Sequence, residues 1–138
     1  MNRMGQEGTL KSVTIMIVEN NSDLRNTLRH AFVGRGYLTW TCRAPEIAVS
    51  IFDSIQPSVV ILDLDFEEGH VLDLLDIWRE RSPKTRVIVE SASADAERVQ
   101  EAMKHGAHAF LTKPFALAPL FHLLEYGVPP TPPITKAA

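Results

Sequence analysis

The sequence has little of what secreted, zinc-stabilised and membrane proteins need. Its one cysteine, Cys42, excludes an internal disulfide, and no Cys/His spacing suggests a zinc site. The first twelve residues contain no apolar segment of the kind found in secretory signals, and the apolar runs are far too short to cross a membrane. We therefore expect a cytoplasmic protein that does not interact with a membrane.

The chain also lacks a strong charge of either sign. Its 14 Lys and Arg against 17 Asp and Glu give a net charge of −3, which argues against direct nucleic-acid binding. A length of 138 residues with 45% hydrophobic residues is typical of one globular domain. We expect a flexible N-terminal segment at 1–11, a folded core at 12–127 and a Pro-rich C-terminal tail at 128–138, extended and unpacked.

Short apolar segments alternate along the core with amphipathic segments of helical period. The expected strands are 13–18, 38–42, 59–62, 86–89 and 109–111. The segment 59–62 is apolar on both faces, as a central parallel strand must be. Five strand–helix units predict an α/β fold, a doubly wound parallel sheet with helices on both faces.

Polar residues follow four of these strands, at the edge of the sheet where such folds bind ligands. They are Glu19 and Asn20 after the first strand, Asp63 and Asp65 after the third, Ser91 after the fourth and Lys113 after the fifth. Carboxylate and amide oxygens suit Mg²⁺ or Mn²⁺. A carboxylate beside such a cation can attack phosphorus, and a lysine and a hydroxyl can hold the phosphoryl oxygens.

Four segments resemble the response-regulator receiver domains (CheY-like) of two-component signalling. They read I-V-E-N-N-S-D-L-R, V-V-I-L-D-L, V-I-V-E-S-A-S-A-D and A-M-K-H-G-A-H-A-F-L-T-K-P-F, and the last is the most specific. The spacings from Asp63 to Ser91 and from Ser91 to Lys113 also match. The resemblance covers about residues 12–126 and implies a five-stranded, flavodoxin-like (βα)5 fold with strand order 2-1-3-4-5.

The resemblance also implies a role for each site residue. Asp63 would be the phospho-acceptor, Ser91 and Lys113 would hold the phosphoryl group, and Phe110 would be an aromatic switch that turns inward with Ser91. Mg²⁺ (or Mn²⁺) would be held by Glu19, Asn20, Asp63 and the backbone carbonyl of Asp65. The Lys113–Pro114 peptide would be cis.

Four features depart from the receiver pattern, and one of them is the loop after Asp63, where Phe66, Glu67 and Val71 replace the usual residues. Asn20 replaces the second acidic residue and should weaken the cation site. Asp65 adds a carboxylate, and our hypothesis is that its side chain restores the charge lost at Asn20. Glu90 precedes Ser91 where an apolar residue is usual, and we expect it near the surface or paired, because a buried carboxylate needs a partner.

The expected function is a phosphorylation-dependent signalling switch. A sensor histidine kinase or a histidine phosphotransfer protein would donate the phosphoryl group, and the chain would catalyse only its own phosphorylation and dephosphorylation. A downstream protein would dock on the fourth helix, fifth strand and fifth helix, about residues 95–105, 109–111 and 115–126, and a homodimer is possible. The alternative is a degenerate receiver that binds partners without phosphorylation. An FMN-binding flavodoxin is disfavoured, because E-N-N-S-D after the first strand has no glycine to cradle a phosphate.

Overall fold

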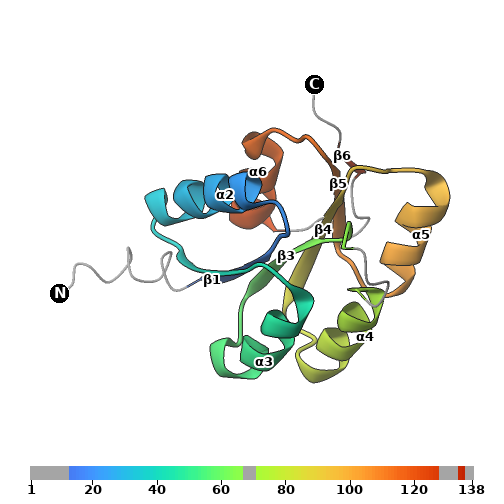
Figure 1. Ribbon diagram of the computed structural model, residues 1–138, viewed down its shortest axis with the longest axis horizontal. Helices are drawn as coiled ribbons and strands as arrows, with labels where there is room; N and C mark the ends of the chain where they lie inside the picture. The colour runs from blue at the N-terminus through green and yellow to red at the C-terminus, as the bar shows by residue number, and fades with distance from the viewer. Residues whose placement is uncertain (1–12, 67–70, 128–133, 136–138) are drawn as a thin grey trace.

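The computed structural model of the chain describes residues 13–66, 71–127 and 134–135. The strands are β1 (Thr14–Val18), β2 (Leu38–Cys42), β3 (Val59–Asp63), β4 (Arg86–Ser91), β5 (Ala109–Thr112) and β6 (Ile134–Thr135). The helices between them are α2 (Ser22–Gly34), α3 (Pro45–Ile55), α4 (Val71–Arg81), α5 (Ala96–Lys104) and α6 (Leu117–Tyr126) (Figure 1). The expected N-terminal segment 1–11 lies outside the described residues.

All the strands are parallel, and they lie in the order β2-β1-β3-β4-β5-β6. The order 2-1-3-4-5 and the α/β class predicted from the sequence are therefore confirmed. The chain runs from β1 outward to β2 and then crosses back to β3 on the other side of β1. This reversal creates a switch point beside the carboxyl ends of β1 and β3, where ligands bind in sheets of this kind.

The tail adds an element that the sequence did not predict. Ile134–Thr135 forms β6, which pairs with β5 at Phe110 and Leu111. The expectation that the whole tail is unpacked is therefore wrong for these two residues. The remainder of the tail, 128–133 and 136–138, lies outside the described residues.

Two layers of helices cover the sheet, and side chains alternate between the two faces along each strand. Helices α2 and α6 contribute Leu28, Phe32, Leu120 and Leu123 to the core on one face. Helices α3, α4 and α5 cover the other face (Figure 1). On that face, the rings of Phe52 and Trp78 stack with their centroids 4.9 Å apart. No helix in the described part of the chain is long and apolar enough to span a membrane.

Candidate functional site

Three carboxylates end neighbouring strands on the same face of the sheet. Asp63 is the last residue of β3 and lies opposite Glu90 in the register of β4. Glu19 follows β1 directly, one step after the registered pair of Val18 and Leu62. Residues two apart in a strand face the same side of the sheet. The residues two positions before these three carboxylates are buried isoleucines, so the carboxylates lie on the same face as that part of the core. One ligand atom from each lies within 4.8 Å of the others.

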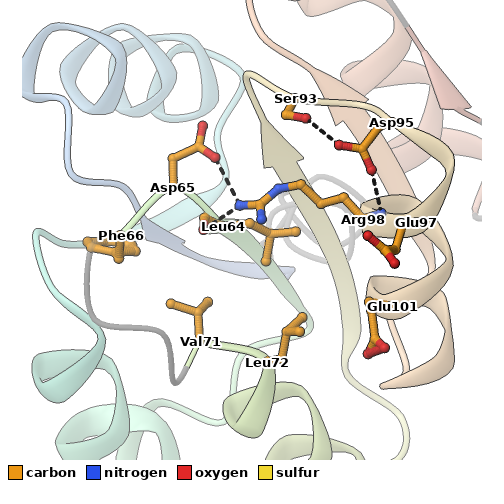
Figure 2. A pocket seen from close by; sticks show the side chains of 10 residues that line it. All are labelled: Leu64, Asp65, Phe66, Val71, Leu72, Ser93, Asp95, Glu97, Arg98 and Glu101. Carbon is orange, nitrogen blue, oxygen red and sulfur yellow. Dashed lines mark hydrogen bonds and ion pairs between the residues drawn. The ribbon is translucent and has the colours of Figure 1, made fainter.

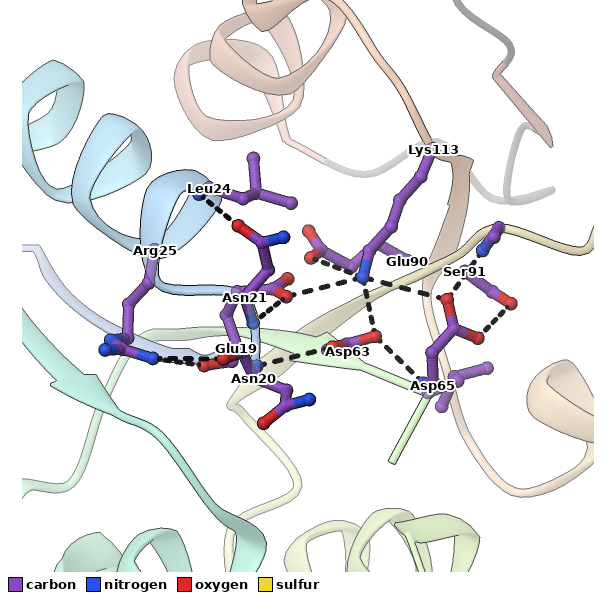
Figure 3. A network of polar contacts seen from close by, with 12 residues as sticks. Glu19, Asn20, Asn21, Leu24, Arg25, Asp63, Asp65, Glu90, Ser91 and Lys113 are labelled. Atoms are coloured by element: carbon purple, nitrogen blue, oxygen red, sulfur yellow. Dashed lines mark hydrogen bonds and ion pairs between the residues drawn. The ribbon is translucent and has the colours of Figure 1, made fainter. Parts of the chain in front are cut away.

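Lys113 supplies the positive charge at the centre of this cluster, the acidic triad of Glu19, Asp63 and Glu90 (Figure 3). Its Nζ donates to Asp63 Oδ1 at 2.9 Å and to Glu19 Oε2 at 3.4 Å. Glu90 Oε1 lies 3.9 Å from the same nitrogen, an ion-pair distance rather than a hydrogen bond. Lys113 is therefore the shared counter-ion of the triad. The Lys113–Pro114 peptide is cis, as the resemblance implied.

The backbone around the triad presents donors to two of its members. Asp63 Oδ1 accepts from the N–H of Asp65 at 2.8 Å, and its Oδ2 accepts from the N–H of Asn20 at 3.4 Å. Glu19 Oε2 accepts from the N–H of Asn21 at 2.9 Å. These donors come from the loops after β1 and β3, so the turns that follow the strands orient both carboxylates.

Burial acts differently on the three acids. It raises the pKa of Glu90 well above its ordinary value, and the Glu19 carboxylate raises that pKa further. Burial also raises the pKa of Asp63, although Lys113 and the Asp65 N–H act against it. At Glu19 burial is outweighed by Glu90, the Asn21 N–H and Lys113, so its pKa lies below the ordinary value. Negative charge is thus hardest to place on Glu90.

Glu90 is the unsatisfied member of the triad. Its side chain is fully buried, and neither of its carboxylate oxygens has a hydrogen-bond partner in the described structure; Glu19 Oε1 lacks one as well. We expected Glu90 near the surface or paired: it is not near the surface, and its one charge partner in the described structure is Lys113 at 3.9 Å. A buried acid without a donor is costly unless a proton or a cation accompanies it.

Ser91 points to the opposite face and belongs to a second network. Its hydroxyl donates to Asp65 Oδ1 at 2.7 Å and accepts from Arg98 Nε at 2.9 Å. Arg98 Nη2 also donates to Asp65 Oδ1 at 3.1 Å and to the carbonyl of Leu64 at 2.8 Å. Asp65 Oδ2 accepts from the N–H of Ala92 at 2.7 Å. Asp65 and Arg98 thereby hold the Ser91 hydroxyl, and we call this pair of residues the serine latch.

The remaining predicted residues lie at different depths. Asn20 is exposed at the rim of the site, and the structure shows no hydrogen bond from its side-chain amide. Phe110 is fully buried with the core under α3, α4 and α5, so its ring already occupies an inward position. Sequence reasoning did not identify Arg98 at all. The signal that could have found it is its place one turn after the Asp95 helix cap, in the helix that directly follows Ser91.

A cavity of about 570 Å³ opens beside the serine latch, between the loop after β3 and helices α4 and α5 (Figure 2). Leu64 and Val71 contribute apolar walls, and Glu97 and Glu101 contribute carboxylates. Arg98 lines the cavity too.

Comparisons with known proteins identify the family of the chain. The family model for the response regulator receiver domain matches residues 15–125. The chain belongs to the response regulator receiver family. A crystal structure of a response regulator from Thermotoga maritima is similar, with a TM-score of 0.76 and 25% identity over 85% of this chain and 98% of that one.

Two curated relatives carry a receiver-like segment within longer chains. The regulatory protein AtoC of Escherichia coli is 32% identical over 103 residues, which is 75% of this chain and 22% of AtoC. The photosynthetic apparatus regulatory protein RegA of Cereibacter sphaeroides is 28% identical over 122 residues, which is 86% of this chain and 66% of RegA. The chain thus spans less than two thirds of each of these relatives.

Proposed function

We propose that this receiver domain is a phosphorylation-dependent signalling switch that accepts a phosphoryl group on Asp63. The observation that carries the proposal is the 2.9 Å contact between Lys113 Nζ and Asp63 Oδ1 at the switch point of the sheet. It places an ammonium where it can hold both the carboxylate and a phosphoryl oxygen. The donor would be a sensor histidine kinase or a histidine phosphotransfer protein, in line with the receiver family.

The transfer is a displacement at phosphorus. A carboxylate oxygen of Asp63 forms the new bond to phosphorus while the bond to the donor imidazole nitrogen breaks, and the imidazole keeps the electron pair. Lys113 then faces the added charge, and Ser91 is the hydroxyl nearest to it along β4. Hydrolysis of the acyl phosphate by water would return Asp63 to its starting form. Self-phosphorylation and dephosphorylation are the only reactions we assign to the domain.

The donor set fits a divalent cation. Buried carboxylate oxygens at Glu19 and Glu90 have no hydrogen-bond donor, as expected where a cation is to be bound. Glu19 and Asp63 would hold Mg²⁺ or Mn²⁺ together with the backbone carbonyl of Asp65, with the Asn20 amide at the rim. When bound, the cation would neutralise charge on the carboxylates and on the phosphoryl oxygens. The substitution at Asn20 should lower the affinity relative to a carboxylate there.

The output would be altered docking on the face of α5, β5 and α6. Phosphorylation would draw Ser91 out of the serine latch and shift an existing equilibrium of the α5 region, with Phe110 already in its inward position. Strand β6 pairs with β5 at this same face, so a downstream protein that docks there would contact both strands. A homodimer through this face remains an expectation.

The decisive experiment is the intact mass of the chain after incubation with Mg²⁺ and acetyl phosphate. The Asp63→Asn variant is the control, because it keeps the shape of the side chain and removes the nucleophile. We expect a gain of one phosphoryl group in the parent and none in the variant. A parent chain that gains nothing from acetyl phosphate and nothing from a histidine-phosphorylated donor, while remaining folded, would rule the proposal out.

One observation favours a second candidate, a degenerate receiver that docks without phosphorylation. The serine latch holds the switch hydroxyl with a carboxylate and a guanidinium, and Asn20 lowers the charge of the cation site. Both features oppose entry into a phosphorylated state. The same mass experiment separates the two candidates, because only the switch gains mass.

A further inference from the structure

We propose that Glu90 is a direct carboxylate ligand of the divalent cation and replaces the charge that Asn20 lacks. The site would then be a three-carboxylate site for a divalent cation. This inference rests on the proposed function only in assuming that a cation binds at the acidic triad. The receiver pattern usually has an apolar residue at the position of Glu90, so this role would be particular to this chain.

The first support is the geometry of the triad. Sheet register alone places Glu90 beside Asp63, and ligand atoms of Glu19, Asp63 and Glu90 lie within 4.8 Å of one another. Ligands on opposite sides of Mg²⁺ are about 4.2 Å apart, because each bond is about 2.1 Å long. Separations of at most 4.8 Å therefore let one divalent cation bridge the three carboxylates with small side-chain movements.

The second support is the set of atoms without partners. Both oxygens of Glu90 and Oε1 of Glu19 are buried without a hydrogen-bond donor, whereas the Asp63 oxygens and Glu19 Oε2 are satisfied. A single cation between the side chains would give all three orphaned oxygens a partner. With a cation bound, all three carboxylates would be ionised, and together with the Lys113 ammonium they would carry two net negative charges, which a divalent cation neutralises.

The third support is that Asp65, the other acid that could replace the charge missing at Asn20, is engaged elsewhere. The Asp65 carboxylate accepts from Ser91, Ala92 and Arg98, so both of its oxygens are satisfied within the serine latch. The distance from Asp65 Oδ2 to Lys113 Nζ is 3.7 Å, which leaves it at the edge of the triad. The side chain of Asn20 is exposed. The geometry thus favours Glu90 over Asp65 as the compensating acid.

The test measures cation binding directly, with no phosphodonor present. Free Mn²⁺ is followed by electron paramagnetic resonance during titration of the full chain, and Mg²⁺ affinity is obtained by competition. The key variant is Glu90→Gln, which keeps the side-chain shape and removes the charge. The matched control is Glu97→Gln, which removes one exposed carboxylate on α5 from outside the triad.

We expect Glu90→Gln to weaken the binding of both Mn²⁺ and Mg²⁺ by at least about tenfold, because one ligand carboxylate is lost. Glu97→Gln should bind both cations as the parent does. Thermal unfolding in EDTA should show Glu90→Gln at least as stable as the parent, because it removes the charge of a buried carboxylate that accepts no hydrogen bond. Weaker binding then cannot be ascribed to misfolding.

Two results would overturn the inference. One is Mn²⁺ affinity in Glu90→Gln within twofold of the parent, which would mean that Glu90 only shares a proton with Glu19. The other is a parent chain that binds no Mn²⁺ at millimolar concentration. Neither depends on phosphorylation: a chain that takes up a phosphoryl group while Glu90→Gln binds Mn²⁺ normally keeps its proposed function and loses this inference.

Discussion

The hydroxyl of Ser91 donates a hydrogen bond to the carboxylate of Asp65 at 2.7 Å, although 26 positions separate the two residues. Ser91 is fully buried and also accepts from Arg98 Nε. The group proposed to bind the phosphoryl oxygen is therefore already bound to an acid two residues after the acceptor. Phosphorylation has to compete with that contact.

Weakening the serine latch should favour the activated form. In Arg98→Ala the Ser91 hydroxyl loses one partner, and a hydrogen bond of this kind contributes about 1 kcal/mol, or about a fivefold change. We expect the affinity for beryllofluoride, measured by amide chemical shifts near Asp63, to rise by about that factor. Arg81→Ala is the control, because its ion pair with Asp53 is exposed and remote. An unchanged or lower affinity in Arg98→Ala would show that the latch does not oppose activation.

Removing Lys113 should destabilise the fold through the triad. Lys113→Met keeps the length of the stem but leaves Asp63 and Glu19 without their ammonium partner. Loss of one partner from a buried pair costs about 3 kcal/mol, measured here by urea unfolding in EDTA. In the Asp63→Asn background the same change should cost clearly less, since one carboxylate is gone. Equal costs in both backgrounds would argue against the ion pair as the cause.

Acid should destabilise the protein through His108. Its Nδ1 accepts the N–H of Val87 at 3.0 Å, and burial together with the nearby Arg86 lowers its pKa below the ordinary 6.5. The pKa of His108 is therefore lower in the folded than in the unfolded chain, so the unfolded chain binds the proton more readily. The contribution of neutral His108 to the free energy of unfolding is present above pH 6.5 and is lost as the pH falls through 6.5 toward the pKa of the folded state. In His108→Gln this part of the pH dependence of unfolding should disappear. A parent and a variant with parallel profiles from pH 7.5 to 5 would refute the assignment.

Cys42 should be chemically inert in the folded protein. It is 2% exposed, and burial raises the pKa of its thiol to about 11, so little thiolate forms at pH 8. We expect iodoacetamide to leave the native chain unmodified by mass spectrometry over a period in which the urea-unfolded chain reacts fully. Native alkylation at a comparable rate would mean that β2 opens frequently.

Local pattern determined much of this protein. The five expected strands, the helices between them and the α/β class follow from short apolar runs and from the helical spacing of apolar residues, which depend only on neighbours along the chain. The same reasoning placed Asp63, Ser91 and Lys113 at one edge of the sheet, because residues that follow parallel strands gather there. A family resemblance supplied the strand order, and the sheet confirms it.

Tertiary structure alone decided how those residues are used. Asp65 looked like a spare carboxylate for the cation, yet contacts with Ser91 and Arg98 from distant parts of the chain engage it elsewhere. Glu90 was expected near the surface or paired, and the register of β4 against β3 buries it beside Asp63, within ion-pair distance of Lys113. The short β6 in the tail exists only because β5 offers it an unpaired edge. Such contacts join residues far apart in sequence, and local periodicity carries no information about which partner a side chain meets.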